Sequence, residues 1–128
     1  GTYSSRIGES KIMINLATII DKLELKVLTA EKDFSQISIK KGYTSDLLSC
    51  VMAGAPNSSI WVTLQAHNNI VAVAALLELS AIIITEGATP DPATIHKANE
   101  EGITLLQTEQ NSFHTVGLLW ELGIRAEK

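Results

Sequence analysis

A threefold alternation of strand-like and helix-like segments fills the second half of the chain and limits the folds open to it. The strand-like runs are 59–65, 81–87 and 102–108, and the helical patterns that follow them are 69–79, 92–101 and 112–122. Successive strand–helix units build a parallel sheet whose crossover helices pack against it. We therefore expect an α/β fold, a compact layered domain with a mainly parallel sheet flanked by helices. The continuous β-branched run "AIIIT" at 81–85 is typical of a central strand covered on both faces.

The first part of the chain is less regular. Its apolar spacing predicts a helix over 15–23 with Asn15 as N-cap, then a short strand within 25–30. A further strand is expected near 37–39, followed by a turn at Gly42 and a helix over about 46–53, capped by Thr44 or Ser45. Residues 1–12 are polar and lack the apolar stretch of a signal peptide, so we interpret them as an added segment ahead of a natural start at Met13. The expected organisation is one domain over 13–128.

Composition excludes several classes of function. A net charge of -4 with no basic run beyond Lys40-Lys41 leaves no surface for nucleic acid. No segment reaches the roughly 18 uninterrupted apolar residues of a membrane span. Cys50 is the single cysteine, which excludes an internal disulfide and indicates a cytoplasmic location.

The helix over 69–79 is apolar on every side, with Glu78 as its one charged residue. Such a helix is buried on more than one side, between the sheet and either a neighbouring helix or a second copy of the chain. Small residues permit close helix approach, so a homodimer interface is the favoured prediction and burial by the same chain is the alternative. The predicted interface residues are Ile70, Val71, Ala74, Ala75 and Glu78.

Polar residues follow each of the three strands. Ligands of parallel α/β sheets bind beyond the carboxyl ends of the strands, where helix N-termini favour an anion. The predicted ligand-binding residues are Gln65, His67, Asn68, Thr85, Glu86, Gly87 and Thr108. The alternative is that these loops only cap helices, with Asn69, Asp91 and Ser112 as N-caps.

Three further side chains are assigned to packing. Cys50, with no His-Asp partner, is expected to pack as a small apolar group. Trp61 and Trp120 are expected to anchor a core or an interface.

Little in the sequence favours catalysis. No metal and no cofactor is expected, because the three histidines have no paired spacing and neither a P-loop nor a GxGxxG motif is present. A small enzyme with His67 or His114 as base, beside Glu86 or Glu109, is the least favoured hypothesis.

The segments "GYTSDLLSCVMAGA", "VTLQAHNNIVAVAALLELSAIIITEGATPDP" and "ANEEGITLLQTEQNSFHTVGLL" together resemble the DRTGG domain over roughly residues 25–123. The resemblance implies a part that regulates or dimerises rather than one that catalyses. Such domains lie beside CBS domains in some inorganic pyrophosphatases, form a non-catalytic segment of phosphate acetyltransferases, and are similar to the N-terminal domain of HPr kinase.

The chain departs from the family pattern at two places. It has "QAHNN" where relatives have an Asp-Arg pair, which puts His67 near the Arg position, and Thr85-Glu86-Gly87 where they have Thr-Gly-Gly. Both changes make an anion site less positive.

These observations together predict a stand-alone, non-catalytic regulatory module. It is expected to form a homodimer and to bind a small polar, phosphorylated or nucleotide ligand at the βα loops. The alternative is an adaptor that binds a protein partner and no small molecule.

Overall fold

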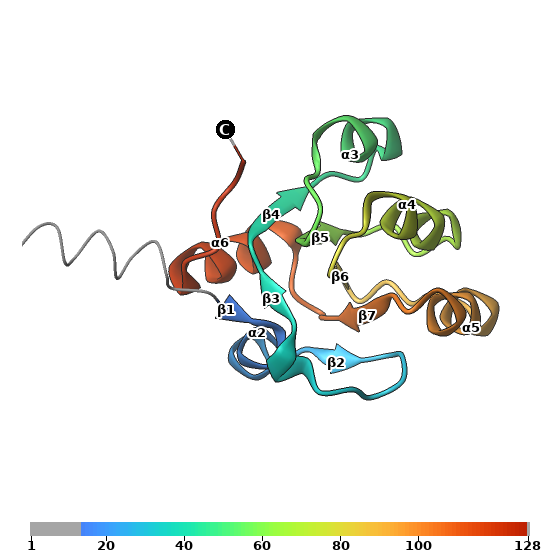
Figure 1. The fold of residues 1–128 in the computed structure, drawn as a ribbon, viewed down its shortest axis with the longest axis horizontal. Helices are drawn as coiled ribbons and strands as arrows, with labels where there is room; N and C mark the ends of the chain where they lie inside the picture. Colours follow the sequence, from blue (N-terminus) through green and yellow to red (C-terminus); the bar gives the residue numbers. More distant parts are fainter. Residues whose placement is uncertain (1–13, 128) are drawn as a thin grey trace, which may run out of the picture.

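The computed structural model describes residues 14–127, and the segment interpreted as an addition, 1–12, lies outside them. The chain forms a five-stranded sheet with helices on both faces and a separate two-stranded sheet (Figure 1). The strands are β1 (Ile14–Asn15), β2 (Lys26–Val27), β3 (Ser38–Ile39), β4 (Lys41–Thr44), β5 (Ser59–Thr63), β6 (Ala81–Ile84) and β7 (Thr104–Gln107). The helices are α2 (Leu16–Leu23), the 3-10 turn η1 (Phe34–Gln36), α3 (Leu48–Gly54), α4 (Asn69–Leu77), α5 (Pro92–Glu101) and α6 (Ser112–Leu122).

The strand order is β2-β7-β6-β5-β4, so the four parallel strands β4 to β7 are adjacent in the same order in which the chain makes them. Right-handed crossovers between neighbours in one direction place every connecting helix on the same face. Accordingly α3, α4 and α5 cover one face, whereas α2 and α6 cover the other (Figure 1). The edge strand β2 is antiparallel to β7. The predicted α/β fold with a mainly parallel sheet is confirmed.

Each face of the sheet has its own core. On the α2 and α6 side the strands contribute Ile60, Val62, Ala81, Ile83 and Leu106. On the other side they contribute Trp61, Ile82, Ile84 and Leu105. Successive residues of β5 and β6 are therefore buried on alternate faces, which explains why these strands are apolar throughout.

The apolar helix α4 is covered by its own chain. It packs on the sheet and lies between α3 and α5 (Figure 1). Ile70, Val71 and Ala74 are 0% exposed within the single chain, so they have no surface to offer a second copy. Their assignment to a dimer interface is wrong because neighbouring helices, the alternative considered above, already bury them. Of the other interface candidates, Ala75 is half-buried and Glu78 is exposed.

Several boundaries differ from the prediction. Gly42 lies inside β4, paired with Ile60 of β5, rather than at a turn. A side chain there would meet Ile124 Cγ2 at 3.0 Å, which explains the glycine. Helix α3 begins only at Leu48, and its N-cap residue, Leu47, makes no side-chain capping bond. Neither Thr44 nor Ser45 caps this helix; the Thr44 hydroxyl donates to Val62 O and Ser45 O accepts from Trp61 Nε1.

Two of the predicted helix N-caps are confirmed, and two lie one residue away from the predicted position. Asn15 and Asp91 cap α2 and α5 as expected, but the N-cap residues of α4 and α6 are Asn68 and Asn111, each one residue earlier than predicted. Asn111 accepts from His114 N–H, whereas Asn68 makes no side-chain capping bond.

Among the residues assigned to packing, Trp61 is fully buried as predicted. The prediction for Cys50 is wrong: its side chain is exposed, because Val51 is the residue of α3 that turns inward. Trp120 is 51% exposed and is thus not a core residue. Within residues 14–127, none of the helices is long and apolar enough to cross a membrane.

Candidate functional site

The carboxyl ends of the parallel strands bring four loops to one edge of the sheet. Three of these loops follow β5, β6 and β7 and carry all the predicted ligand-binding residues. The fourth follows β4 and contributes Asp46, which the sequence analysis did not consider. The four parallel strands are aligned in register, so their loops are neighbours in the order of the strands.

The loops after β6 and β7 are bound to each other. Glu86 N–H donates to Gln110 O at 2.8 Å, and Gly87 N–H donates to Thr108 O at 3.0 Å. The buried Thr85 hydroxyl lies 2.7 Å from the Ser112 hydroxyl. Thr85 therefore braces the start of α6 rather than facing solvent, and the Thr108 hydroxyl accepts from Gln110 N–H.

The loop after β5 is held by Asp46. The Asp46 carboxylate accepts hydrogen bonds from the buried Thr63 hydroxyl at 2.8 Å and from Leu64 N–H at 2.9 Å. Gln65 Nε2 donates to Asp46 O at 3.2 Å. The amide of Gln65, predicted to bind a ligand, is thus engaged in joining two loops.

His67 and Asn68 lie immediately before α4 and are exposed. His67 Nδ1 accepts from Asn69 N–H at 3.3 Å, which leaves Nε2 as the nitrogen directed to other partners. Across the adjacent loop, the Thr94 backbone N–H holds the pKa of the Asp91 carboxyl below its usual value, with smaller effects from the Thr94 side chain and from His67.

The charges on this edge are negative. Its loops carry Asp46, Glu86, Asp91 and Glu109, and the segments 45–47, 64–68, 85–91 and 108–111 contain no Lys or Arg. Helix N-termini favour anions, but these carboxylates act in the opposite direction at short range. The arrangement is unfavourable for a phosphate group.

The turn after β6 carries backbone strain. Glu86 has φ +63° and Gly87 has φ +69°, a conformation that glycine adopts freely and other residues avoid. Glu86 thus occupies a position that suits glycine, and a Cβ on Gly87 would lie 2.7 Å from Glu109 Oε1. The backbone conformation of the loop after β6, and not only its polarity, therefore determines which residues suit positions 86 and 87.

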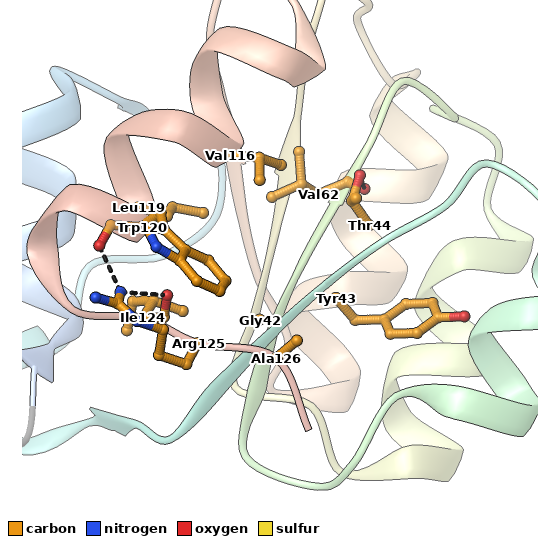
Figure 2. Close-up of a pocket in the computed structure, with 10 residues that line it drawn as sticks. All are labelled: Gly42, Tyr43, Thr44, Val62, Val116, Leu119, Trp120, Ile124, Arg125 and Ala126. Carbon is orange, nitrogen blue, oxygen red and sulfur yellow. Dashed lines mark hydrogen bonds between the residues drawn. The ribbon is translucent and has the colours of Figure 1, made fainter. Parts of the chain in front are cut away.

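A second candidate site, not foreseen from the sequence, lies along the edge strand β4, where the segment after α6 returns beside it. It is an apolar groove of about 290 Å³ between β4 and α6 (Figure 2). We call it the β4–α6 groove, and its lining residues are Gly42, Tyr43, Thr44, Val62, Val116, Leu119, Trp120, Ile124, Arg125 and Ala126.

The chain end closes this groove. Gly42 N–H donates to Arg125 O at 3.0 Å, so residue 125 begins to extend the sheet beside β4. The Arg125 guanidinium lies 4.3 Å from the centre of the Trp120 ring and donates from Nη1 to Trp120 O (Figure 2). No sequence pattern predicts this contact, because it depends on where the last helix delivers the chain.

Metal-binding groups are not gathered anywhere in the part of the chain that the structure describes: it contains no cluster of three or more His, Cys, Asp and Glu side chains suited to an ion. His96 lies on the exposed face of α5, 3.5 Å from Glu100. His114 is exposed in the first turn of α6.

Comparison with known proteins supports a family assignment. No curated protein sequence matches the chain. The fold is similar to the crystal structure of the CBS and DRTGG domains of the regulatory region of Clostridium perfringens pyrophosphatase, complexed with its activator, diadenosine tetraphosphate. That similarity has a TM-score of 0.68 and 22% sequence identity, and covers 82% of this chain but 45% of the other. The family model of the DRTGG domain matches residues 49–122, from the start of α3 to the end of α6, which is more than half of the sequence. The chain belongs to the DRTGG domain family.

Proposed function

We propose that the chain is a non-catalytic regulatory module that responds to a small ligand. The observation that carries this proposal is its membership of the DRTGG family together with a fold shared with a regulatory region that was solved with a nucleotide activator. The chain spans less than half of that regulatory region, so the ligand of the neighbour is a guide to the class of ligand and not to its place.

The arrangement of polar groups also favours recognition over catalysis. His67, the best candidate for a base, has Nδ1 occupied by Asn69 N–H. Thr85 is buried against Ser112, and Gln65 joins two loops. Groups committed to bracing loops are suited to hold a surface in shape, whereas an enzyme needs a base aimed at a substrate.

The predicted ligand site at the carboxyl edge stays a proposal, with a narrower chemistry. His67 Nε2, the Asn68 amide and the Glu86 carboxylate are the groups there that remain for a ligand. Because four carboxylates border this edge, a polar ligand without a phosphate suits it better than a phosphorylated one.

A homodimer is also proposed, now through a different surface of α4. Leu76 is 67% exposed on the side of the helix that faces away from the sheet, next to the half-buried Ala75. Leu76→Glu should convert a dimer into a monomer in light scattering while leaving the circular dichroism spectrum unchanged. A wild-type chain that is monomeric at micromolar concentration would remove this part of the proposal. The single cysteine, which is exposed and free, is consistent with a proposed location in the cytoplasm.

The first test of regulation is a thermal-shift screen with nucleotides, dinucleotides, acyl phosphates and unphosphorylated polar metabolites. A ligand at about 100 times its dissociation constant adds roughly 2.7 kcal/mol to the free energy of unfolding, or several degrees in Tm. A shift that vanishes in His67→Ala or Glu86→Gln would assign the ligand to the carboxyl edge. Asp33→Asn, on a distant exposed turn, is the matched control. No shift with any class would remove the proposal of a small-molecule sensor.

One observation favours a protein-binding adaptor as the second candidate. Phe113 is 90% exposed in the first turn of α6, and so large an exposed aromatic ring is typical of interaction surfaces. An adaptor would show no thermal shift with small molecules, and its binding to a purified partner would fall in Phe113→Ala.

A further inference from the structure

The β4–α6 groove offers main-chain hydrogen-bonding groups at an open sheet edge. Main-chain groups point alternately to the two sides along a strand, and Gly42 N–H points away from β5 because it donates to Arg125 O. The Gly42 carbonyl and the Thr44 N–H therefore face the same outer side. Within residues 14–127, neither the Gly42 carbonyl nor the Thr44 N–H takes part in a hydrogen bond outside the strand ladder.

The walls of the groove are apolar and aromatic. Val62 of β5 and Val116 of α6 line it, and the Trp120 ring points toward its centre in Figure 2. The absence of a side chain at Gly42 lets Ile124, another lining residue, pack against the strand, since a Cβ there would lie 3.0 Å from Ile124 Cγ2. A largely apolar cavity with a few placed polar groups is typical of sites for small planar ligands.

From these features we infer that the groove binds the adenine base of a nucleotide. The N6 amino group of adenine would donate to the Gly42 carbonyl, and N1 would accept from Thr44 N–H. The two residues lie two positions apart on one strand edge, so they present an acceptor and a donor side by side, which matches that edge of adenine. Contact with the Trp120 ring would supply the apolar part of the binding.

The charge at the rim fits a nucleotide better than a bare nucleoside. Arg125 is held over the Trp120 ring and uses Nη1 for Trp120 O, which leaves its other N–H groups for a phosphate. Lys40 and Lys41 stand at the start of the same strand, while the carboxylates closest in sequence are Glu121 and Glu127. This margin of the sheet is more basic than the carboxyl edge, whose loops carry no Lys or Arg.

The inference rests on the proposed regulatory function. It gives the sensed ligand a chemical class and places it in the groove, in place of the carboxyl edge proposed above. It is tested by titrating the chain with AMP, adenosine and GMP while following tryptophan fluorescence and heat of binding. Trp61 is fully buried and Trp120 is half-exposed, so a ligand in the groove should change the emission of Trp120. We expect AMP to bind more tightly than adenosine, and GMP at least about 10-fold more weakly than AMP.

Variants locate the site. Trp120→Ala should weaken AMP binding by about 10-fold or more, whereas Phe113→Ala removes an exposed aromatic from the same helix and should leave binding unchanged. Thr44→Pro removes the N–H at an edge position where proline is tolerated, and should weaken binding by about 10-fold. Thr44→Val keeps the N–H, loses only the hydroxyl bond to Val62 O, and should bind as the wild type. If Thr44→Pro does not fold, Val116→Phe fills the groove instead.

The possible failures are distinct. Wild-type AMP affinity in both Trp120→Ala and Val116→Phe would overturn the groove as the site while leaving the proposed regulatory function intact. A shift with some other ligand class, and none with AMP, would overturn adenine as the ligand. No effect of any ligand would remove the proposed function as well. A wild-type dimer that Trp120→Ala dissociates, with no response to AMP, would show that the groove is an interface between two copies and would overturn the inference.

Discussion

The Asp46 carboxylate accepts a hydrogen bond from the Thr63 hydroxyl at 2.8 Å, and this bond joins the ends of two neighbouring parallel strands. Asp46 follows β4, and Thr63 is the last residue of β5 and is fully buried. The same Asp46 oxygen accepts from Leu64 N–H, so one side chain satisfies two donors at the point where β5 leaves the sheet.

Asp46→Ala should lower the free energy of unfolding by about 1–3 kcal/mol, because the buried Thr63 hydroxyl loses its acceptor. Urea denaturation measures the change. In a Thr63→Val background, where no hydroxyl remains to be satisfied, the same substitution should cost clearly less. Equal costs in the two backgrounds would show that the bond to Thr63 is not what Asp46 contributes.

Glu86→Gly should stabilise the chain by up to about 1 kcal/mol, because Glu86 has φ +63° and glycine relieves that strain. Glu86→Ala is the matched control, since alanine removes the carboxylate and keeps the strain. A gain of the same size in both variants would assign it to the lost charge rather than to the backbone.

Gly87 and Gly102 form a natural pair for comparison. They have φ +69° and +72°, but only at Gly87 would a Cβ meet another group, Glu109 Oε1 at 2.7 Å. Replacement by Ala should cost about 1–2 kcal/mol at either position, with an additional few tenths at Gly87. The excess at Gly87 should disappear in a Glu109→Ala background, as thermal unfolding can show.

Asp91 should make the stability depend on acid pH. Its pKa is lowered in the folded state, chiefly by the Thr94 backbone N–H that donates to Oδ1 at 2.8 Å. A lowered folded-state pKa contributes stability that is complete above the unfolded-state value, about 4, and is lost as pH falls through the folded-state value. The stability of the wild type relative to Asp91→Asn, which keeps the cap, should therefore fall on acidification from pH 7 to pH 2. A difference that is constant over this range would contradict the assignment.

The two sides of α4 should respond differently to truncation. Ile70→Ala removes a side chain that is 0% exposed and should cost about 2–5 kcal/mol, whereas Leu76, 67% exposed, should change stability by less than about 0.5 kcal/mol when replaced by Ala. Urea denaturation of the two variants under dilute, monomeric conditions makes the comparison. A large cost at Leu76 under those conditions would mean that its neighbours in the chain bury it.

The sequence predicts the elements whose ends are set by local chemistry. Helix α5 begins after its N-cap residue, Asp91, and ends before its left-handed C-cap residue, Gly102. Helix α6 likewise ends before a left-handed glycine, Gly123. Prediction from the sequence fails where contacts between distant parts of the chain determine the local structure. Gly42 looks like a turn residue, but the approach of Ile124 from the other end of the chain requires a glycine inside a strand.

The same distinction holds for the candidate sites. The gathering of the βα loops at one edge follows from the order of strands and helices, so it could be expected from the pattern alone. The role of Asp46 could not, because its bond to Thr63 depends on which strands are neighbours. The β4–α6 groove depends on the contact between Gly42 and Arg125, which no local pattern records.

The cores on the two faces of the sheet also differ in which parts of the chain form them. The core beneath α3, α4 and α5 is built almost entirely from one continuous stretch, since these helices connect strands that are neighbours both in sequence and in space. The opposite core needs α2 and α6, which come from the two ends of the described chain and contact each other. Closing a long loop costs more chain entropy than closing a short one. We therefore predict that the α3–α5 layer forms before the α2–α6 layer in folding, and that the α2–α6 layer has the weaker protection against amide hydrogen exchange.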